Sequence, residues 1–331
     1  MPSVEATLKW SAVTAVAPVA WGTTYYVTHR YLPPDYPLYG AVLRAVPAGL
    51  LLLAVRRRLP TGSWWWRSMV LGTLNMGAFF ALIYLAAQLL PTSVASTVMA
   101  TSPVAMMLLA WSILSERPRV LSLVGAGLGI TGVCVMLLTG VGRINPGGVL
   151  ASVAAMTMSS VGYVLAKKWS AAQGGRGPID VLSLTAWQLL AGGLVLIPIA
   201  AVVEGAPPAL SAGAVFGFAY VSVIATAVAF VAWFSGLRHL SAGAVGLIGL
   251  LNPVTGVLLG TSLAGDALTL QQVLGLVLVF GGILLGQPVV GRWVRRWRVR
   301  TPVAAGESAE PIPDVPHPDN VERNKAVAPR R

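Results

Sequence analysis

The sequence predicts an all-α polytopic membrane protein with 10 transmembrane helices, arranged as two inverted five-helix repeats. Three observations predict this fold: the composition is apolar, long apolar stretches recur along the chain, and short motifs repeat 150 residues apart. Of the 331 residues, 56% are hydrophobic and 10% are charged, whereas a soluble domain carries about 25% charged residues. We therefore do not expect water to be the main solvent of this chain.

Ten apolar segments are long enough to cross a bilayer. A helix needs roughly 20 apolar residues, at a rise of 1.5 Å per residue, to span the hydrocarbon core. Proline marks most of the short connections between the segments, as expected where helices stop. The ten expected spans are 9–29, 36–55, 68–89, 93–114, 120–139, 147–166, 181–203, 211–235, 241–263 and 269–289.

The first span contains Ala15-Val16-Ala17, which resembles the cleavage site of a signal peptide. We reject that interpretation because the apolar stretch continues past this site, and because the repeat needs this helix to balance the sixth. The expected organisation comprises an N-terminal cytoplasmic segment 1–8, a first repeat 9–140, a second repeat 147–289, and a basic and then disordered tail 290–331.

The distribution of lysine and arginine predicts the orientation of the helices. If the N-terminus is cytoplasmic, the cytoplasmic segments carry 16 Lys and Arg residues, and the opposite side carries only Arg30 and Arg143. Basic residues accumulate in cytoplasmic connections, so we expect both termini in the cytoplasm. The net charge of +12 is then a topology signal, with attraction to anionic lipid as a secondary effect, and we expect no nucleic-acid partner.

The clearest internal match joins Thr101-Ser102-Pro103-Val104 to Leu251-Asn252-Pro253-Val254, 150 residues later. Each copy of the repeat contains five expected spans. Because five is odd, the second copy should enter the membrane from the opposite side. Inverted repeats of this kind are typical of secondary transporters, whose binding sites lie near the midplane where the repeats meet.

Pro103 and Pro253 lie near the middle of the fourth and ninth expected spans. A proline there removes one backbone hydrogen bond and disturbs the carbonyl four residues earlier, here those of Met99 and Gly249. Freed carbonyls at this depth are tolerated where protein or a wet cavity satisfies them. The prolines therefore predict helix kinks beside a binding site. The alternative is an ordinary membrane-helix kink that duplication copied passively.

Glycines recur in the fifth and tenth expected spans, where small residues let helices approach closely. We expect them to serve packing within the bundle, and a dimer face is the alternative. These glycines are Gly125, Gly129, Gly132, Gly275, Gly282 and Gly286.

Several short motifs occur in a characteristic order along residues 9–289. They are Trp21-Gly22, Leu43-Arg44, Tyr84 to Leu90, Thr101 to Val104, Ser115-Glu116-Arg117, Gly125 to Gly132, Trp187-Gln188, Asn252-Pro253-Val254 and Gly281-Gly282. In this order and spacing the chain resembles the drug/metabolite transporter (DMT) superfamily, EamA type. Within that superfamily it most resembles the bacterial aromatic amino-acid (YddG-type) exporters. Two positions depart from the family pattern: Asp266 replaces the more usual Glu, and Ser159-Ser160 stand where an aromatic residue is common.

The resemblance implies a secondary transporter of the bacterial inner membrane. Such a protein would export amino acids, aromatic or neutral, or similar small metabolites by alternating access around a midplane cavity. The expected partners are this small-molecule substrate and membrane lipid, and we expect a monomer or weak dimer without a cofactor or a bound metal.

The positions of the acidic residues and histidines bear on two other functions, the export of other solutes and enzymatic activity. All eleven acidic residues fall outside the expected spans, which argues against an exchange of protons for a cationic drug at a buried carboxylate. Export of cationic drugs or of sugar nucleotides remains the alternative. An enzyme would need paired carboxylates, a histidine cluster or a nucleophile beside a base, and the chain shows none of these patterns, so we do not expect one.

Aromatic and small polar residues inside the spans are the expected lining of the cavity. A zwitterionic amino acid with a large side chain needs rings to stack on, and donors and acceptors for its charged ends. Most aromatic residues inside a membrane bundle pack against neighbours or lipid, which is the plainer alternative for each. The candidates are Trp21, Tyr25, Asn75, Phe79, Tyr84, Met99, Ser102, Ser159, Tyr163, Trp187, Gln188, Tyr220, Phe230, Trp233 and Asn252.

Arg44 is the only charged residue in the interior of an expected span. An arginine at such depth should face the bundle interior or reach an interface. It either contacts a substrate carboxylate or acts as a structural residue bonded to backbone carbonyls, and the family resemblance favours the structural role.

Overall fold

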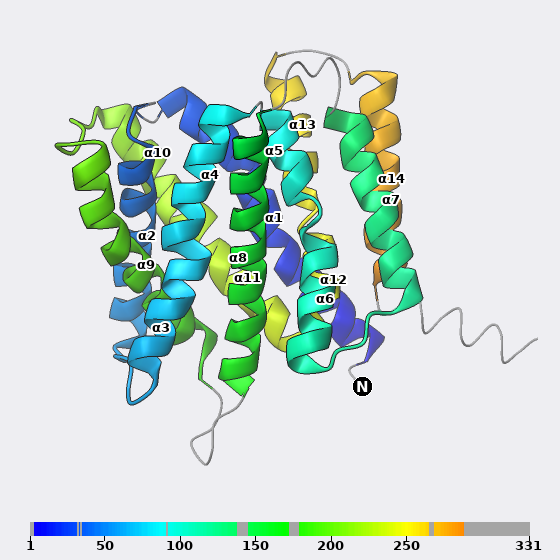
Figure 1. The fold of residues 1–331 in the computed structure, drawn as a ribbon, viewed down its shortest axis with the longest axis horizontal. Coiled ribbons are helices and arrows are strands. Elements are labelled where there is room, and N and C mark those ends of the chain that lie inside the picture. Colours follow the sequence, from blue (N-terminus) through cyan, green and yellow to red (C-terminus); the bar gives the residue numbers. More distant parts are fainter. Residues whose placement is uncertain are drawn as a thin grey trace, which may run out of the picture. The chain divides into compact units, whose positions relative to one another are not determined.

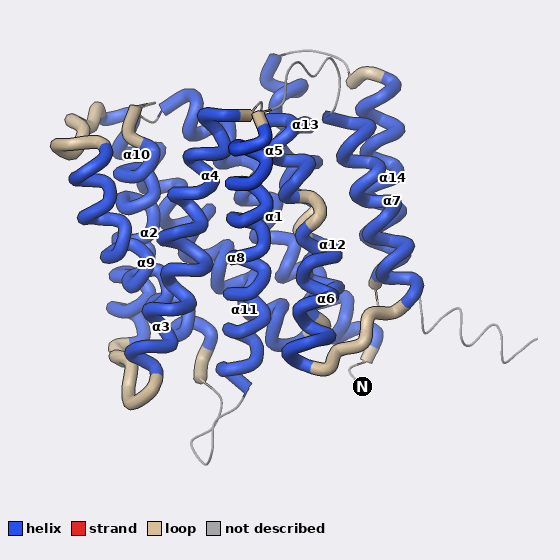
Figure 2. The backbone as a smooth tube through the Cα atoms, viewed as in Figure 1, coloured by secondary structure: helices blue, strands red, loops and turns tan. Residues whose placement is uncertain are grey.

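The computed structural model describes residues 3–31, 33, 35–90, 92–137, 145–171, 179–264 and 268–287, which are helical apart from short connections. The chain divides into the units Met1–Trp293 and Val294–Arg331, and all described residues belong to the first. The predicted tail 290–331 and Asp266 therefore lie outside the described residues. In the first unit the helices run side by side, and the connections lie at the two ends of the bundle (Figures 1 and 2).

The first half of the bundle contains one long helix, a second helix, two interrupted stretches and a closing helix. The interruptions are a π-helical segment, η1, and a break between α5 and α6. The elements are α1 (Val4–Tyr31), α2 (Pro37–Arg56), α3 (Trp64–Gly72), η1 (Thr73–Gly77), α4 (Ala78–Leu89), α5 (Thr92–Met99), α6 (Ser102–Leu114) and α7 (Val120–Leu137).

The second half has the same order, with a π-helical segment η2 and a break between α12 and α13. Its elements are α8 (Pro146–Ala171), α9 (Val181–Val203), α10 (Ala212–Ser222), η2 (Val223–Val228), α11 (Ala229–His239), α12 (Ala242–Ile248), α13 (Leu251–Ala264) and α14 (Leu270–Gly286).

In the part of the chain that the structure describes, eight helical stretches are long enough and apolar enough to cross a membrane. The first and last of the ten expected spans are not among them. Helix α14 is apolar but has only 17 residues. Helix α1 has 28 residues, but its threonines, tryptophans and tyrosines lower its hydropathy.

The two π-helical segments occupy corresponding places in the two halves. Segment η1 begins at Thr73 and η2 begins at Val223, which is the offset of 150 residues found between the sequence motifs. A π turn holds more residues than an α turn, so each segment rotates the following side chains relative to a regular helix. Figure 1 shows that α3, η1 and α4 run in the direction opposite to α10, η2 and α11.

The proline kinks predicted from the sequence are complete helix breaks. Helix α5 ends at Met99 and α6 begins at Ser102, so that Pro103 lies in the first turn of α6, where its missing N–H is least costly. Pro253 likewise lies in the first turn of α13. Tight turns bridge the breaks: the N–H of Thr101 donates to the carbonyl of Val98 at 3.0 Å.

Helices α7 and α14 pack through their glycines, as expected for packing within the bundle. A Cβ added to Gly125 would lie 2.5 Å from the carbonyl oxygen of Gly282, and one added to Gly132 would lie 2.6 Å from that of Gly275. Backbone meets backbone at both places, so a larger residue would force the helices apart. The remaining two glycines, Gly129 and Gly286, face the side chains of Leu250 and Leu247.

Candidate functional site

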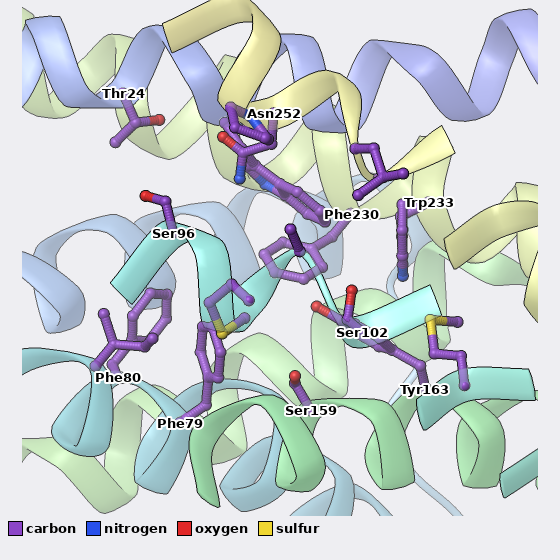
Figure 3. Close-up of a pocket in the computed structure, with 18 of the residues that line it drawn as sticks. Thr24, Phe79, Phe80, Ser96, Ser102, Ser159, Tyr163, Phe230, Trp233 and Asn252 are labelled. Carbon is purple, nitrogen blue, oxygen red and sulfur yellow. The ribbon is translucent and has the colours of Figure 1, made fainter. Parts of the chain in front are cut away.

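A cavity of about 260 Å³ lies where the two helix breaks face the other helices (Figure 3). Its volume is close to the lower end of the range for ligand pockets, roughly 300–1,000 Å³, so it suits a small metabolite. Residues of both halves of the chain line it: Trp21, Thr24, Arg44, Phe79, Phe80, Ile83, Ser96, Met99, Ala100, Ser102, Met106, Ser159, Tyr163, Phe230, Trp233, Gly249, Leu250, Asn252 and Pro253.

The cavity brings together many of the residues expected from the sequence to line one. Figure 3 shows Asn252 and Trp233 on one side and Phe79 and Ser159 on the opposite side, all directed toward the same space. Both helix breaks contribute, because Ser102 is the first residue of α6 and Asn252 is the second residue of α13. The expected residues on the cavity are Trp21, Phe79, Met99, Ser102, Ser159, Tyr163, Phe230, Trp233 and Asn252, together with Arg44 and Pro253.

Aromatic rings from α1, α8 and α11 form a continuous wall of this cavity. The ring of Trp21 lies 5.1 Å from that of Phe230 and 5.2 Å from that of Trp233, between centroids. Tyr163 continues the wall, with its ring 5.4 Å from that of Trp233. Tilted rings at these separations attract one another and hold the apolar wall in place.

Arg44 joins helix α2 to segment η2. Its Nε donates to the hydroxyl of Thr226 at 3.0 Å, and its Nη2 donates to the carbonyl of Ala225 at 3.2 Å. The guanidinium lies over the ring of Phe80, 5.0 Å from the centroid. Arg44 thus makes the backbone contact of a structural arginine, and it is also the one charged residue among those that line the cavity.

Two buried polar atoms on the cavity have no hydrogen-bond partner among the described residues. They are Nε1 of Trp233, which is a donor, and Oδ1 of Asn252, which is an acceptor. Only 3% of Trp233 is exposed. An unpaired buried polar atom costs about 1–3 kcal/mol, so both atoms are suited to a bound molecule that offers one acceptor and one donor.

Asn75 and Gln188 pair with each other away from the cavity. The Nδ2 of Asn75 donates to the Oε1 of Gln188 at 2.7 Å, and Gln188 donates onward to the carbonyl of Leu184 at 3.2 Å. The sequence placed Asn75 on the same face as Phe79, because residues four apart share a face of an α-helix. Asn75 lies within η1, whose wider turns change the phase before Phe79, so Phe79 lines the cavity and Asn75 does not.

Two further aromatic candidates also lie away from the cavity. The indole Nε1 of Trp187 donates to the carbonyl of Arg58 at 2.8 Å. The hydroxyls of Tyr220 and Thr23 lie 2.7 Å apart. For both residues the sequence indicated a position inside a span but not the face of the helix. The other two candidates, Tyr25 and Tyr84, lie in α1 and α4, and their side chains are outside the described residues.

The cavity also contains residues that the sequence did not single out. Phe80 is adjacent in sequence to the candidate Phe79, and Ser96 lies one turn before the break that Pro103 marks. An aromatic residue beside a candidate and a serine near a helix break are both too common in apolar helices to be selected from the sequence. The others are Thr24, Ile83, Ala100, Met106, Gly249 and Leu250.

The connection between α6 and α7 lies at the end of the bundle that holds the N-terminus (Figure 1), and its residue Glu116 joins the two halves. Its carboxylate pairs with Lys167 at 2.6 Å and accepts from the N–H of Ala242 at 3.0 Å. Lys167 also donates to the carbonyl of Leu240 at 2.7 Å. These bonds tie the connection after α6 to the end of α8 and the junction of α11 with α12.

Asp180 and Arg56 form a second ion pair, between the start of α9 and the end of α2, at 2.9 Å. Burial raises the pKa of Asp180, but hydrogen bonds from Arg56 and Ser183 outweigh it, so the pKa lies below its ordinary value. The pair links the ends of the helices that carry Gln188 and Arg44.

Comparison with known proteins gives consistent results over most of the chain. The model of the EamA-like transporter family matches residues 8–138 and 146–286. Protein PecM of Dickeya dadantii is 35% identical, over 82% of this chain and 90% of PecM. The uncharacterized inner membrane transporter YedA of Escherichia coli K12 is 28% identical, over 81% of this chain and 87% of YedA. A solved crystal structure has the same fold, with a TM-score of 0.72 at 18% identity, over 86% of this chain and 98% of that chain.

Proposed function

The chain belongs to the EamA-like transporter family, and we propose that it exports amino acids, aromatic or neutral, or similar small metabolites across the bacterial inner membrane. It is a multi-pass membrane protein, and both its family and the relative YedA are transporters rather than enzymes. One observation carries the substrate proposal: an aromatic wall and a single cation, Arg44, line the same small cavity.

The chemistry of the lining supports a zwitterion with an apolar side chain. The rings of Trp21 and Trp233 offer faces for an apolar or aromatic group, and Arg44 offers its charge to a carboxylate. The unpaired Oδ1 of Asn252 suits an ammonium group. No Asp or Glu is among the described lining residues, which disfavours a cationic drug. A sugar nucleotide carries several phosphate charges and would call for more cations than one.

The proposed mechanism is alternating access between two inverted repeats, 9–140 and 147–289. All ten expected spans cross the membrane in this proposal, α1 and α14 included, and both termini are cytoplasmic. The helix breaks at Pro103 and Pro253 lie at the cavity, so the repeats exchange shapes around the bound molecule. The bonds of Glu116 and Lys167 then close the cytoplasmic end in this conformation.

A flux assay with the purified full-length chain in liposomes tests the proposal. We expect entry of radiolabelled tryptophan, phenylalanine or leucine above the rate in protein-free vesicles, and much slower entry of lysine. The same measurement with and without a pH gradient decides between proton coupling and facilitated export. Rates equal to those of empty vesicles for every amino acid would contradict the proposal.

Growth of cells gives an independent measurement. Cells that overexpress the protein should survive higher concentrations of toxic aromatic amino-acid analogues, because export lowers the internal concentration. Unchanged sensitivity across a panel of analogues would remove the aromatic substrate from the proposal.

A further inference from the structure

Arg44 lies half-buried inside the bundle, and its guanidinium has no carboxylate partner among the described residues. Among the described residues the ion pairs are Arg56–Asp180 and Lys167–Glu116, and neither involves Arg44. A buried cation inside a membrane protein is costly unless an anion or several polar groups compensate it. Protein groups supply only part of this compensation at Arg44: one hydroxyl, one carbonyl and the face of one ring.

The hydrogen bonds of Arg44 use one edge of the guanidinium. Its Nε–H and one Nη2–H lie on the same side, and both donate to segment η2, at Thr226 and Ala225. The guanidinium has five N–H groups, so three remain. Two of them, one on Nη1 and one on Nη2, form a second edge, and the third points from Nη1 toward Cδ. An edge of this kind matches the two oxygens of a carboxylate.

Segment η2 also holds one residue of the aromatic wall, Trp21. The carbonyl of Ala225 accepts from Nε1 of Trp21 at 3.1 Å as well as from Arg44 at 3.2 Å. Thr226 is fully buried at 0% exposure, so its hydroxyl has no water to compete for the bond with Arg44. Segment η2 therefore fixes both the charge of Arg44 and the ring of Trp21, and both residues line the cavity.

We propose that Thr226 is a positioning residue that, with the Ala225 carbonyl, holds one edge of Arg44 so that the other edge receives the carboxylate of the transported molecule. The proposal rests on the proposed function and narrows it to substrates with a free carboxylate. Thr226 does not line the cavity, and it acts through Arg44.

The test compares carboxylates with their uncharged counterparts in wild type and in Thr226 variants. The probes are L-tryptophan, L-tryptophanamide and indole-3-propionate, measured by flux into liposomes. Thr226→Val removes the hydroxyl while keeping the shape, and Thr226→Ser restores it. Thr185→Val is the matched control, because Thr185 is equally buried and its hydroxyl bonds only within its helix, to the carbonyl of Val181 at 2.7 Å.

We expect Thr226→Val to raise KM for tryptophan about tenfold while the maximal rate changes less than about threefold, as for loss of one hydrogen bond to a charged group. The preference for tryptophan over its amide should fall by a similar factor. Thr226→Ser should recover both values, and Thr185→Val should leave both unchanged.

Two results would overturn the inference. One is a Thr226→Val protein that keeps the wild-type KM and the wild-type preference for the carboxylate. The other is a loss of maximal rate and thermal stability with the preference unchanged, which would show a merely structural role.

Binding measured by thermal shift in detergent separates the inference from the proposed function. If wild type moves none of the amino acids, the proposed function fails. The inference then stands only if indole-3-propionate raises Tm in wild type but not in Thr226→Val, and it fails if no such shift occurs.

Discussion

Segments η1 and η2 interrupt corresponding stretches of the two halves, 150 residues apart, yet their surroundings differ. In η1, the amide of Asn75 pairs with Gln188 of α9, away from the cavity. In η2, Ala225 and Thr226 bind Arg44 of α2, on the cavity. Each π segment meets the second helix of the other half, one through two neutral amides and the other through a cation.

The difference follows from the residue at the matching position. Asn75 and Ala225 are equivalent at the offset of 150 residues. The asparagine fills its surroundings with its own side chain, whereas the alanine leaves its carbonyl open to donors from Arg44 and Trp21. The amide pair leaves Oδ1 of Asn75 without a partner among the described residues, but a neutral acceptor costs less to bury than an unpaired cation. We therefore place the functional role on η2 and the structural role on η1.

The largest expected effect comes from removing the cation. Arg44→Gln should lower kcat/KM for tryptophan about 100-fold, roughly 2.7 kcal/mol, because the charged bonds to substrate and to η2 are lost together. The matched change is Gln188→Leu in α9, which removes the partner of Asn75 in η1, and it should keep kcat/KM within about threefold of wild type. Initial rates in liposomes measure both, and similar losses in the two variants would erase the difference between the segments.

The second prediction concerns packing at η1. A Cβ on Gly162 would collide with Oδ1 of Asn75, so Gly162→Ala should destabilise the protein by about 1–3 kcal/mol and lower its Tm in detergent. Gly127→Ala is the control, since no atom lies within 4 Å of a Cβ added there. Equal Tm values for the two variants would show that η1 is loosely packed.

The third prediction distinguishes the effect of the Trp21 ring on KM from the effect of its hydrogen bond. Trp21→Phe removes the donor to Ala225 but keeps an aromatic ring, so KM for tryptophan should rise about fivefold, roughly 1 kcal/mol. Trp187→Phe removes a similar bond, to the carbonyl of Arg58, and should leave KM unchanged. Equal KM increases would mean that both indoles act through general stability.

The smallest expected effect is the coupling of the amide pair. A double-mutant cycle of Asn75→Ala and Gln188→Ala should give about 0.6 kcal/mol, as for other polar pairs between membrane helices. Reversible unfolding in mixed micelles provides the four free energies. A coupling near zero would mean that the 2.7 Å contact adds nothing to η1.

Sequence reasoning predicted the helices and the positions of the two helix breaks more readily than which helix faces line the cavity. Pro103 and Pro253 located the breaks, because the effect of proline on a helix is local and strong. The π segments carry no comparable signal, so the phase shift that separates Asn75 from Phe79 could not be anticipated. Thr226 was missed because its role depends on a contact with Arg44 from another helix, which the sequence around Thr226 does not indicate.

The assignment of Arg44 shows a second limit. The sequence showed that Arg44 lies inside a span. It presented a structural contact and a cavity contact as alternatives, but the side chain makes both. A guanidinium has enough donors to serve two partners, which a one-dimensional pattern does not reveal.

The backbone contacts between α7 and α14 also have a consequence for biosynthesis. About 130 residues separate the end of α7 from the start of α14, which at ~5–20 residues per second is roughly 7 to 30 s of translation. During that interval the glycine face of α7 has left the ribosome without its partner helix. Lipid or an insertion chaperone must cover the face until α14 emerges, so a slow translation site in this interval should lower the yield of assembled protein.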